Sequence, residues 1–255
     1  MNTRIIGVIS GKGGVGKTTL VANLGAVLAE EFKKNVVVLD CNFTTSHLGL
    51  YLGLYDTPVT LNTVLQGKAN LEDAVYKHKS GMSVIPAGLS VNDLKGVDLI
   101  DLEKVVKKLV KKADFVFLDA AAGLGREAIV TMKACDEALF VTIPQAPSAV
   151  DIMRCHKLVQ KYNRTPLGVV VNMVHNKGHE FSSIEIETLT DLPVVGKIPF
   201  DTNIHRALSE RKVLLYYRPN SKTVESYRKI ASWLCGIEYK EKHILERIAN
   251  WLRYR

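Results

Sequence analysis

Two lysines and four glycines crowd into one short segment near the start of the chain, and their spacing suits the binding of phosphate. The segment fits the pattern G-x-x-x-x-G-K-[S/T], and leucines at helical spacing follow it directly. Glycines let backbone N–H groups converge on phosphate oxygens, and a following helix adds its positive amino end. This phosphate loop consists of Gly11, Lys12, Gly13, Gly14, Val15, Gly16, Lys17, Thr18 and Thr19.

The polar side chains in and around this loop predict a site for ATP and Mg²⁺. Lys17 is expected to hold the β and γ phosphates, and the Thr18 hydroxyl to bind Mg²⁺. Asp119 and Asp40 each end an apolar stretch, where a carboxylate can organise the water shell of the metal. The small-residue turn after Asp119 includes Gly123, whose N–H is expected to turn toward the γ phosphate. The alternative for both aspartates is an ordinary role as turn formers or helix caps.

The elements that position these residues alternate along the chain. Seven apolar stretches, too continuous for half-exposed strands, predict a mostly parallel sheet that is covered on both faces. Helical patterns lie between them, so we expect an α/β fold with a doubly wound, Rossmann-like, three-layer architecture and a ligand crevice at the carboxyl ends of the strands. The expected strands are Arg4–Ser10, Asn35–Asp40, Met82–Pro86, Asp114–Asp119, Ala138–Ile143, Leu167–Met173 and Pro193–Ile198. The expected helices are Lys17–Phe32, Asp101–Lys112, Gly125–Ala134, Ala149–Tyr162, Phe181–Leu189, Asn203–Arg211 and Thr223–Cys235.

Length and composition favour one large globular domain. The 255 residues are 47% hydrophobic and 24% charged, which argues against disorder and against a small disulfide-bonded protein. We expect an ATPase domain over residues 1–236 and a separable tail over 237–255. Four widely spaced cysteines suit a reducing cytosol, and neither an export signal nor a membrane-spanning stretch is evident. The net charge of +8 favours acidic partners in general.

The second lysine narrows the interpretation. The string Lys12-Gly13-Gly14-Val15-Gly16-Lys17-Thr18-Thr19 resembles the MinD/ParA family of ATPases with a deviant phosphate loop, and the likeness is closest to MinD-like proteins, including archaeal forms. The resemblance implies that Lys12 reaches the phosphates of a facing subunit in an ATP-dependent homodimer. It also implies that Asp151 pairs with this lysine when no partner subunit is present. Considered by itself, Lys12 is equally well explained as a solvent-facing loop lysine.

The resemblance extends through nearly the whole chain and implies further roles. Residues 39–53 correspond to the first switch segment of the family. Asn172 is similar to an asparagine that reads adenine, and Pro199 and Asp201 lie in a segment that borders the base and ribose.

Several residues depart from the family pattern. They are Asn42, His47, Gln145 and the pair Ala120-Ala121. Nucleotide binding should survive these changes, but an asparagine at position 42 cannot accept a proton from water as a carboxylate can. Asp40 is then the better candidate to position the attacking water. Together with Lys12 and Lys17 it completes the expected catalytic set, and we expect slow hydrolysis that awaits an activator.

The tail reads as an amphipathic helix. Its apolar side chains, Ile244, Leu245, Ile248, Trp251 and Leu252, fall within an arc of about 120° at helical spacing. Basic charge and a tryptophan are typical of a helix that lies in a membrane interface, whereas the alternative is packing against its own domain. Because MinD proteins carry such a helix, the resemblance favours an anionic membrane surface as partner. The expected location is therefore cytoplasmic, peripheral on the inner face of the cell membrane.

Two other functions stay open at this point. Lys104, Lys107, Lys108, Lys111 and Lys112 fall on one face of a predicted helix, which suits nonspecific DNA binding as in ParA partition ATPases, or simply a solvated face. An iron-sulfur carrier ATPase would need cysteines placed to bridge a dimer, and Cys135 is the single candidate near the second switch. The favoured function is an ATPase that positions a cell division site or other cargo with an unknown activator or cargo protein.

Overall fold

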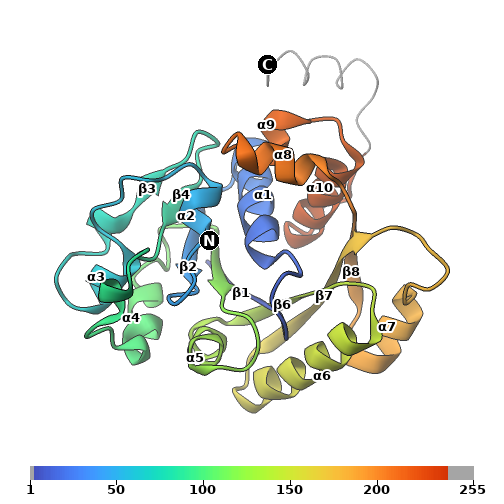
Figure 1. Ribbon diagram of the computed structural model, residues 1–255, viewed down its shortest axis with the longest axis horizontal. Helices are drawn as coiled ribbons and strands as arrows, with labels where there is room; N and C mark the ends of the chain where they lie inside the picture. Colours follow the sequence, from blue (N-terminus) through green and yellow to red (C-terminus); the bar gives the residue numbers. More distant parts are fainter. Residues whose placement is uncertain (1–2, 241–255) are drawn as a thin grey trace.

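A computed structural model describes residues 3–240 of the chain, and its centre is an eight-stranded sheet (Figure 1). The spatial order of the strands is β3-β4-β2-β5-β1-β6-β7-β8, and every neighbouring pair is parallel except β3 with β4. The order reverses direction around β1, as a doubly wound sheet requires. The predicted fold class is therefore confirmed for the domain. The predicted membrane residues Ile244, Leu245, Ile248, Trp251 and Leu252 lie outside the described residues.

All seven predicted strands are present, and their ends differ from the prediction by no more than two residues. The strands are β1 (Arg4–Ile9), β2 (Val36–Cys41), β3 (Tyr76–Lys77), β4 (Ser83–Ile85), β5 (Phe115–Ala120), β6 (Glu137–Thr142), β7 (Thr165–Val174) and β8 (Val194–Pro199). The short edge strand β3 was not predicted, because two residues carry too little pattern to be recognised.

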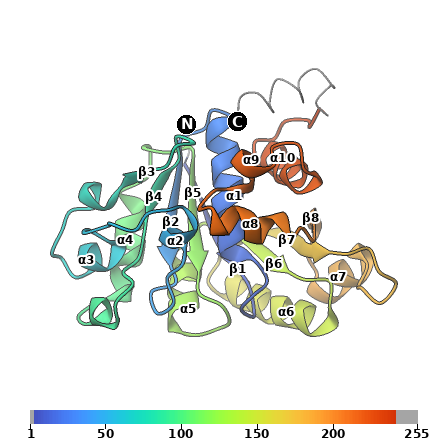
Figure 2. The same cartoon turned by 45° about the horizontal axis from the view of Figure 1, so that its top comes forward.

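The α-helices fall on both sides of the sheet, with α1, α8, α9 and α10 on one face and α5, α6 and α7 on the other (Figures 1 and 2). They are α1 (Lys17–Glu30), α2 (Leu48–Tyr51), α3 (Leu61–Leu65), α4 (Leu102–Lys107), α5 (Arg126–Ala134), α6 (Ala146–Lys161), α7 (Ser183–Thr190), α8 (Asn203–Ser209), α9 (Leu214–Tyr217) and α10 (Lys222–Leu234). Short 3₁₀ turns occupy Glu72–Ala74, Val91–Leu94 and Leu99–Asp101. No helix within residues 3–240 combines the length and the apolar character needed to cross a membrane.

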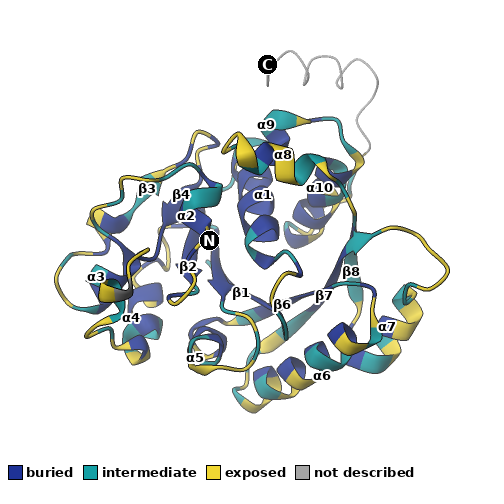
Figure 3. Ribbon diagram, in the orientation of Figure 1, coloured by how far each residue is buried: buried dark blue, intermediate teal, exposed yellow. Residues whose placement is uncertain are grey.

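The core is built by strands that are buried on both faces, which explains their continuous apolar sequence (Figure 3). In β1, Ile6 and Val8 pack toward α1 and α10, whereas Ile5 and Ile9 point into the two clusters on the opposite face. Alternate side chains of β1 thus pack against the helices on the two faces of the sheet. The carboxyl ends of β1, β2 and β5 meet at one edge of the sheet, and this edge carries the phosphate loop.

The helix that carries the basic face is shorter than predicted. It ends at Lys107, and the following residues tighten into i→i−3 turns, in which Lys108, Leu109 and Val110 donate to Val105, Val106 and Lys107. Lys111 is left-handed with φ 68°, and its N–H donates to Thr3 Oγ1 at 2.8 Å. This path buries Leu109 and Ala113 at the cost of the last helical turn.

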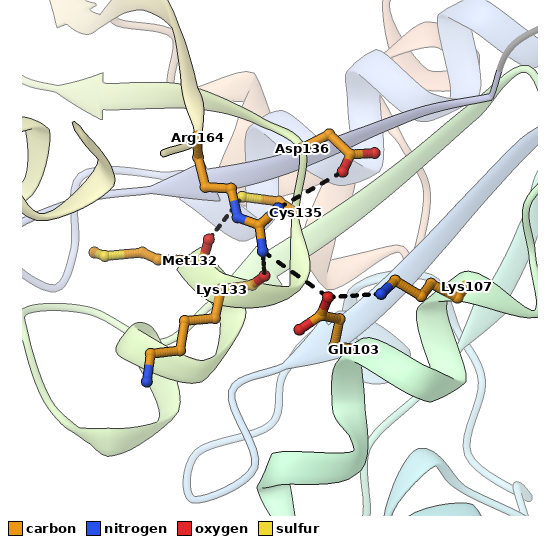
Figure 4. Close-up of polar contacts among 7 residues, drawn as sticks. All are labelled: Glu103, Lys107, Met132, Lys133, Cys135, Asp136 and Arg164. Carbon is orange, nitrogen blue, oxygen red and sulfur yellow. Dashed lines mark hydrogen bonds and ion pairs between the residues drawn. The ribbon is translucent and has the colours of Figure 1, made fainter. Parts of the chain in front are cut away.

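At the sheet edge opposite the phosphate loop, Arg164 joins α4, α5 and the start of β6 (Figure 4). Its guanidinium donates to the carbonyl oxygen of Lys133 at the end of α5, and it lies 3.9 Å from carboxylate oxygens of both Glu103 and Asp136. Glu103 also forms an ion pair with Lys107, whose Nζ lies 2.8 Å from Oε1 of Glu103. These contacts fix the amino edge of the sheet, away from the functional residues.

Candidate functional site

The phosphate loop connects β1 to α1 and adopts the conformation that its glycines permit. Gly14 and Gly16 have φ of 77° and 92°, a left-handed region that side chains with a Cβ rarely enter. The Nζ atom of Lys17 donates to Ser10 Oγ at 2.9 Å, and Ser10 Oγ donates to the Lys12 carbonyl oxygen at 2.8 Å. Burial lowers the pKa of Lys17, while the charge of Asp119 acts in the opposite direction. The loop thus surrounds the positively charged side chain of Lys17, which is the first residue of α1.

Asp119 lies near the end of β5 and faces this loop, but no neighbouring group in residues 3–240 donates a well-formed hydrogen bond to its carboxylate. It is 1% exposed, and neither carboxylate oxygen accepts a hydrogen bond in good geometry from residues 3–240. Burial and then the neighbouring charge of Asp40 raise its pKa to about 7, against the smaller opposing effects of Thr18 and Lys17. An orphaned buried carboxylate is costly, so a metal ion with its water shell is the kind of partner that fits here.

Asp40 is the register partner of Asp119 on the adjacent strand, β2, but its surroundings differ. Its Oδ1 accepts the N–H of Asn42 at 3.0 Å. Its Oδ2 accepts the Ser46 hydroxyl at 2.7 Å and the N–H groups of His47 and Leu48 at 3.2 and 3.1 Å. Burial raises the pKa of Asp40, and these four donors counteract the rise. Asp40 therefore anchors the loop that follows β2, and its Oδ1 keeps one acceptor site open.

The loop anchored by Asp40 is tied to the opposite segment of the site. The amide of Asn42 donates to the Thr45 carbonyl at 2.6 Å and accepts the Thr45 hydroxyl at 3.0 Å. Thr44 donates through its hydroxyl and its N–H to the carboxylate of Glu127 in the first turn of α5. The predicted first switch segment and the segment after Asp119 are thus linked directly.

A cavity of about 460 Å³ extends from the phosphate loop to the ends of β7 and β8. The amide nitrogen of Asn172 donates to the Val15 carbonyl at 2.9 Å, so this predicted base reader also contacts the phosphate loop. Asp201 accepts Asn203 N at 2.9 Å and the Thr223 hydroxyl at 2.9 Å, which fixes the start of α8. The wall consists of Gly13, Gly14, Gly16, Lys17, Thr18, Thr19, Asn42, Thr45, His47, Tyr51, Ala122, Asn172, Met173, Ile198, Pro199, Phe200, Asp201, Ile204, His205, Leu208 and Tyr227.

Three predicted residues have surroundings that the sequence did not anticipate. Gly123 is left-handed, with φ 80°, but its N–H donates to the Ser10 carbonyl at 2.9 Å, so turning toward a phosphate requires that bond to break. Lys12 is half-buried and forms no ion pair within residues 3–240. Asp151 lies against Gly11, close enough that a Cβ there would approach it to 2.2 Å, yet its carboxylate pairs with Arg154 at 3.4 Å. The Lys12–Asp151 pair is therefore not formed.

Several residues of the site were not predicted from the sequence. Ser10 supports Lys17, Ser46 caps Asp40, and Glu127 holds the loop between them. Tyr227 closes the cavity from α10, where burial and the charge of Asp201 raise its pKa. Ser10 stands directly before the motif and was within reach of sequence reasoning. Ser46 lies only six positions from Asp40, but no motif marks it, and the roles of Glu127 and Tyr227 depend on segments that are distant in the sequence.

Comparisons with known proteins agree with this geometry. A family model described as ParA, NUBPL iron-transfer P-loop NTPase matches residues 2–235. The chain belongs to the MinD/ParA family of P-loop ATPases. An ATP-binding protein of Methanocaldococcus jannaschii is 35% identical over 92% of this chain and 89% of its own length. The septum site-determining protein MinD of Buchnera aphidicola is 31% identical over 98% of both chains.

A solved structure provides the same comparison in three dimensions. The septum site-determining protein MinD of Pyrococcus horikoshii, complexed with Mg-ADP, superposes with a TM-score of 0.88 at 33% identity. The match covers 94% of this chain and all of that one. The family resemblance that was inferred from the phosphate loop is thereby confirmed, and with it the classification as a P-loop ATPase.

Proposed function

We propose that this chain is a MinD-like ATPase that binds ATP with Mg²⁺ and dimerises around it. Hydrolysis then releases it from a membrane on which it positions a cell division site or another cargo. The observation that carries the proposal is Lys12, a second cation in the phosphate loop that has no ion-pair partner within residues 3–240. A fixed cation of this kind is suited to the charge that develops on a γ phosphate, as an arginine finger is when a second subunit supplies it.

The other residues of the phosphate loop take complementary roles. Lys17 and the loop N–H groups hold the triphosphate, and the hydrogen bond from Lys17 to Ser10 positions the amino group in advance. Thr18 and Asp119 would hold Mg²⁺, which supplies electrostatic stabilisation of the phosphate oxygens. The unpartnered oxygens of Asp119 beside Thr18 support this assignment.

Asp40 is proposed to orient the attacking water through the open acceptor site on Oδ1, and it also contributes to the metal's water shell. Its other three hydrogen bonds hold the loop that carries Asn42. Because Asn42 cannot act as a base, hydrolysis should be slow until an activator reorganises this loop.

The tail over residues 237–255 is proposed to couple nucleotide state to location at the inner face of the cell membrane. One amphipathic helix binds an anionic surface weakly, whereas two on a dimer gain roughly 10²–10⁴-fold through effective concentration. The test is sedimentation with anionic vesicles under ADP, ATP or no nucleotide. We expect binding that requires ATP, that is lost in the Trp251→Glu variant and that is retained in Asn250→Ala on the polar face. Equal sedimentation under ADP and ATP would overturn the coupling.

Nonspecific DNA binding, as in ParA proteins, receives less support from the structure. The helix expected to carry the basic face ends at Lys107, and three of its five lysines are paired. Lys104 contacts Asp101 at 2.6 Å, Lys107 contacts Glu103 at 2.8 Å and Lys112 contacts Glu72 at 2.9 Å. A DNA-binding assay on the charge-reversed variant Lys108→Glu, compared with the tail variants, separates the two partners.

An iron-sulfur role is disfavoured by the cysteines, although the matching family model includes iron-transfer proteins. Cys41, Cys135 and Cys155 are each 0% exposed, and Cys135 donates its thiol to the Met132 carbonyl at 3.3 Å. Burial raises the pKa of Cys135 to about 12, which opposes the thiolate that a cluster requires.

A further inference from the structure

Asn172 sits directly beneath the phosphate loop, and the two are fitted to each other. The amide nitrogen of Asn172 donates to the Val15 carbonyl at 2.9 Å, and the side chain is 7% exposed. A Cβ on Gly16 would lie 2.2 Å from the same nitrogen, so the amide fills the space that this glycine leaves. The Val15–Gly16 peptide is therefore held from below by a residue that lies 157 positions away in the sequence.

The strand that carries Asn172 is distorted at this point. Met173 has φ 57°, a left-handed conformation that is unfavourable for a residue with a Cβ. The register of β7 with β8 also shifts between Val171 and Val174. Such an irregularity re-aims a side chain, and here the re-aimed side chain is Asn172. The strained backbone of Met173 and the space that Asn172 fills beside Gly16 thus occur at the same contact.

We propose that Asn172 is a positioning residue for the phosphate loop, in addition to any contact it makes with the base. The amide nitrogen carries two hydrogens, of which one is used by Val15, so one hydrogen and Oδ1 stay available to a base edge. A single amide thus joins the base end of the cavity to the loop that binds the phosphates. The inference rests on the proposed function in one respect, namely that the loop binds a triphosphate.

A ligand that has phosphates but no base distinguishes support of the phosphate loop from recognition of the base. We would measure the affinity of ATP and of inorganic tripolyphosphate, each with Mg²⁺, for the full chain and its variants. Asn172→Ala should weaken tripolyphosphate binding by roughly three- to tenfold because the preset loop is lost, and ATP binding by at least as much, because ATP also loses any contact between the amide and the base. The isosteric Asn172→Asp should weaken both further, because its carboxylate faces the Val15 carbonyl and the phosphates. Phe200→Ala, on the base side of the cavity, is the matched control and should affect ATP alone.

Each outcome decides between the possibilities. Unchanged tripolyphosphate affinity in a folded Asn172→Ala protein overturns the inference, whether or not ATP affinity falls. If that variant does not fold, the comparison is made on Asn172→Asp. Its tripolyphosphate affinity must then fall, whereas the tripolyphosphate affinity of Phe200→Ala must stay unchanged. Wild-type protein that binds neither ligand overturns the proposed function and the inference together. Wild-type protein that binds both but never dimerises overturns the proposed function and leaves the inference standing.

Discussion

Replacing Asp119 with asparagine should stabilise the nucleotide-free protein, and increasingly so as the pH rises. The carboxyl has an ordinary pKa of 3.8, and burial with the charge of Asp40 raises it to about 7 in the folded state. Between these values the folded protein holds a proton that the unfolded chain has released, so stability falls as the pH rises. With these pKa values, the shift lowers the stability of the folded protein by about 2 kcal/mol at pH 5 and by about 4 kcal/mol at pH 8.

The measurable quantity is the difference in unfolding free energy between Asp119→Asn and wild type, from urea titrations without nucleotide or Mg²⁺. We expect this difference to grow in favour of the variant by roughly 2–3 kcal/mol from pH 5 to pH 8. The cost of burying the asparagine amide does not depend on pH, so it does not affect how the difference in unfolding free energy changes with pH. Asp56→Asn, at an exposed position that forms no ion pair within residues 3–240, is the control for the loss of one carboxylate. A difference for Asp119→Asn that does not change with pH would refute the argument that this carboxylate is unsatisfied until a metal arrives.

Three further substitutions test other parts of the account. Glu31→Gln should cost roughly 3–5 kcal/mol of stability in urea titrations, because it breaks the buried ion pair with Arg228 at 2.7 Å; a loss under 1 kcal/mol would contradict this. Gly16→Ala should reduce ATP affinity at least about tenfold, since the new Cβ meets Asn172 at φ 92°, and unchanged affinity would show that the loop adapts freely. Asp40→Asn should speed amide hydrogen exchange in the loop that Asp40 anchors, and exchange as slow as in wild type would remove Asp40 as its anchor.

The sequence was most informative where function depends on consecutive residues. The phosphate loop and the carboxylates at the ends of β2 and β5 follow from local patterns, because a parallel sheet brings strand ends to one edge. Continuous apolar strands likewise predicted a sheet covered on both faces, and the burial of those strands confirms it.

Contacts between distant segments were beyond reach of these patterns. Nothing near Thr44 indicates that it will meet Glu127, and nothing near Asn172 indicates that its amide will support Val15. The end of α4 was also misplaced, because the leucine and valine spacing continues past Lys107 while the backbone tightens to bury Leu109. Tertiary packing decided each of these features, and single-sequence periodicity does not record it.

The central claim is that Lys12 joins two subunits around ATP, and sedimentation velocity of wild type and Lys12→Ala under Mg²⁺ and a slowly hydrolysed ATP analogue tests it most directly. Lys68→Ala, which removes an exposed lysine elsewhere, is the matched control. The account predicts dimers for wild type and the control, and a monomer for Lys12→Ala that still binds the nucleotide. Dimers of Lys12→Ala that form as readily as those of wild type would contradict it.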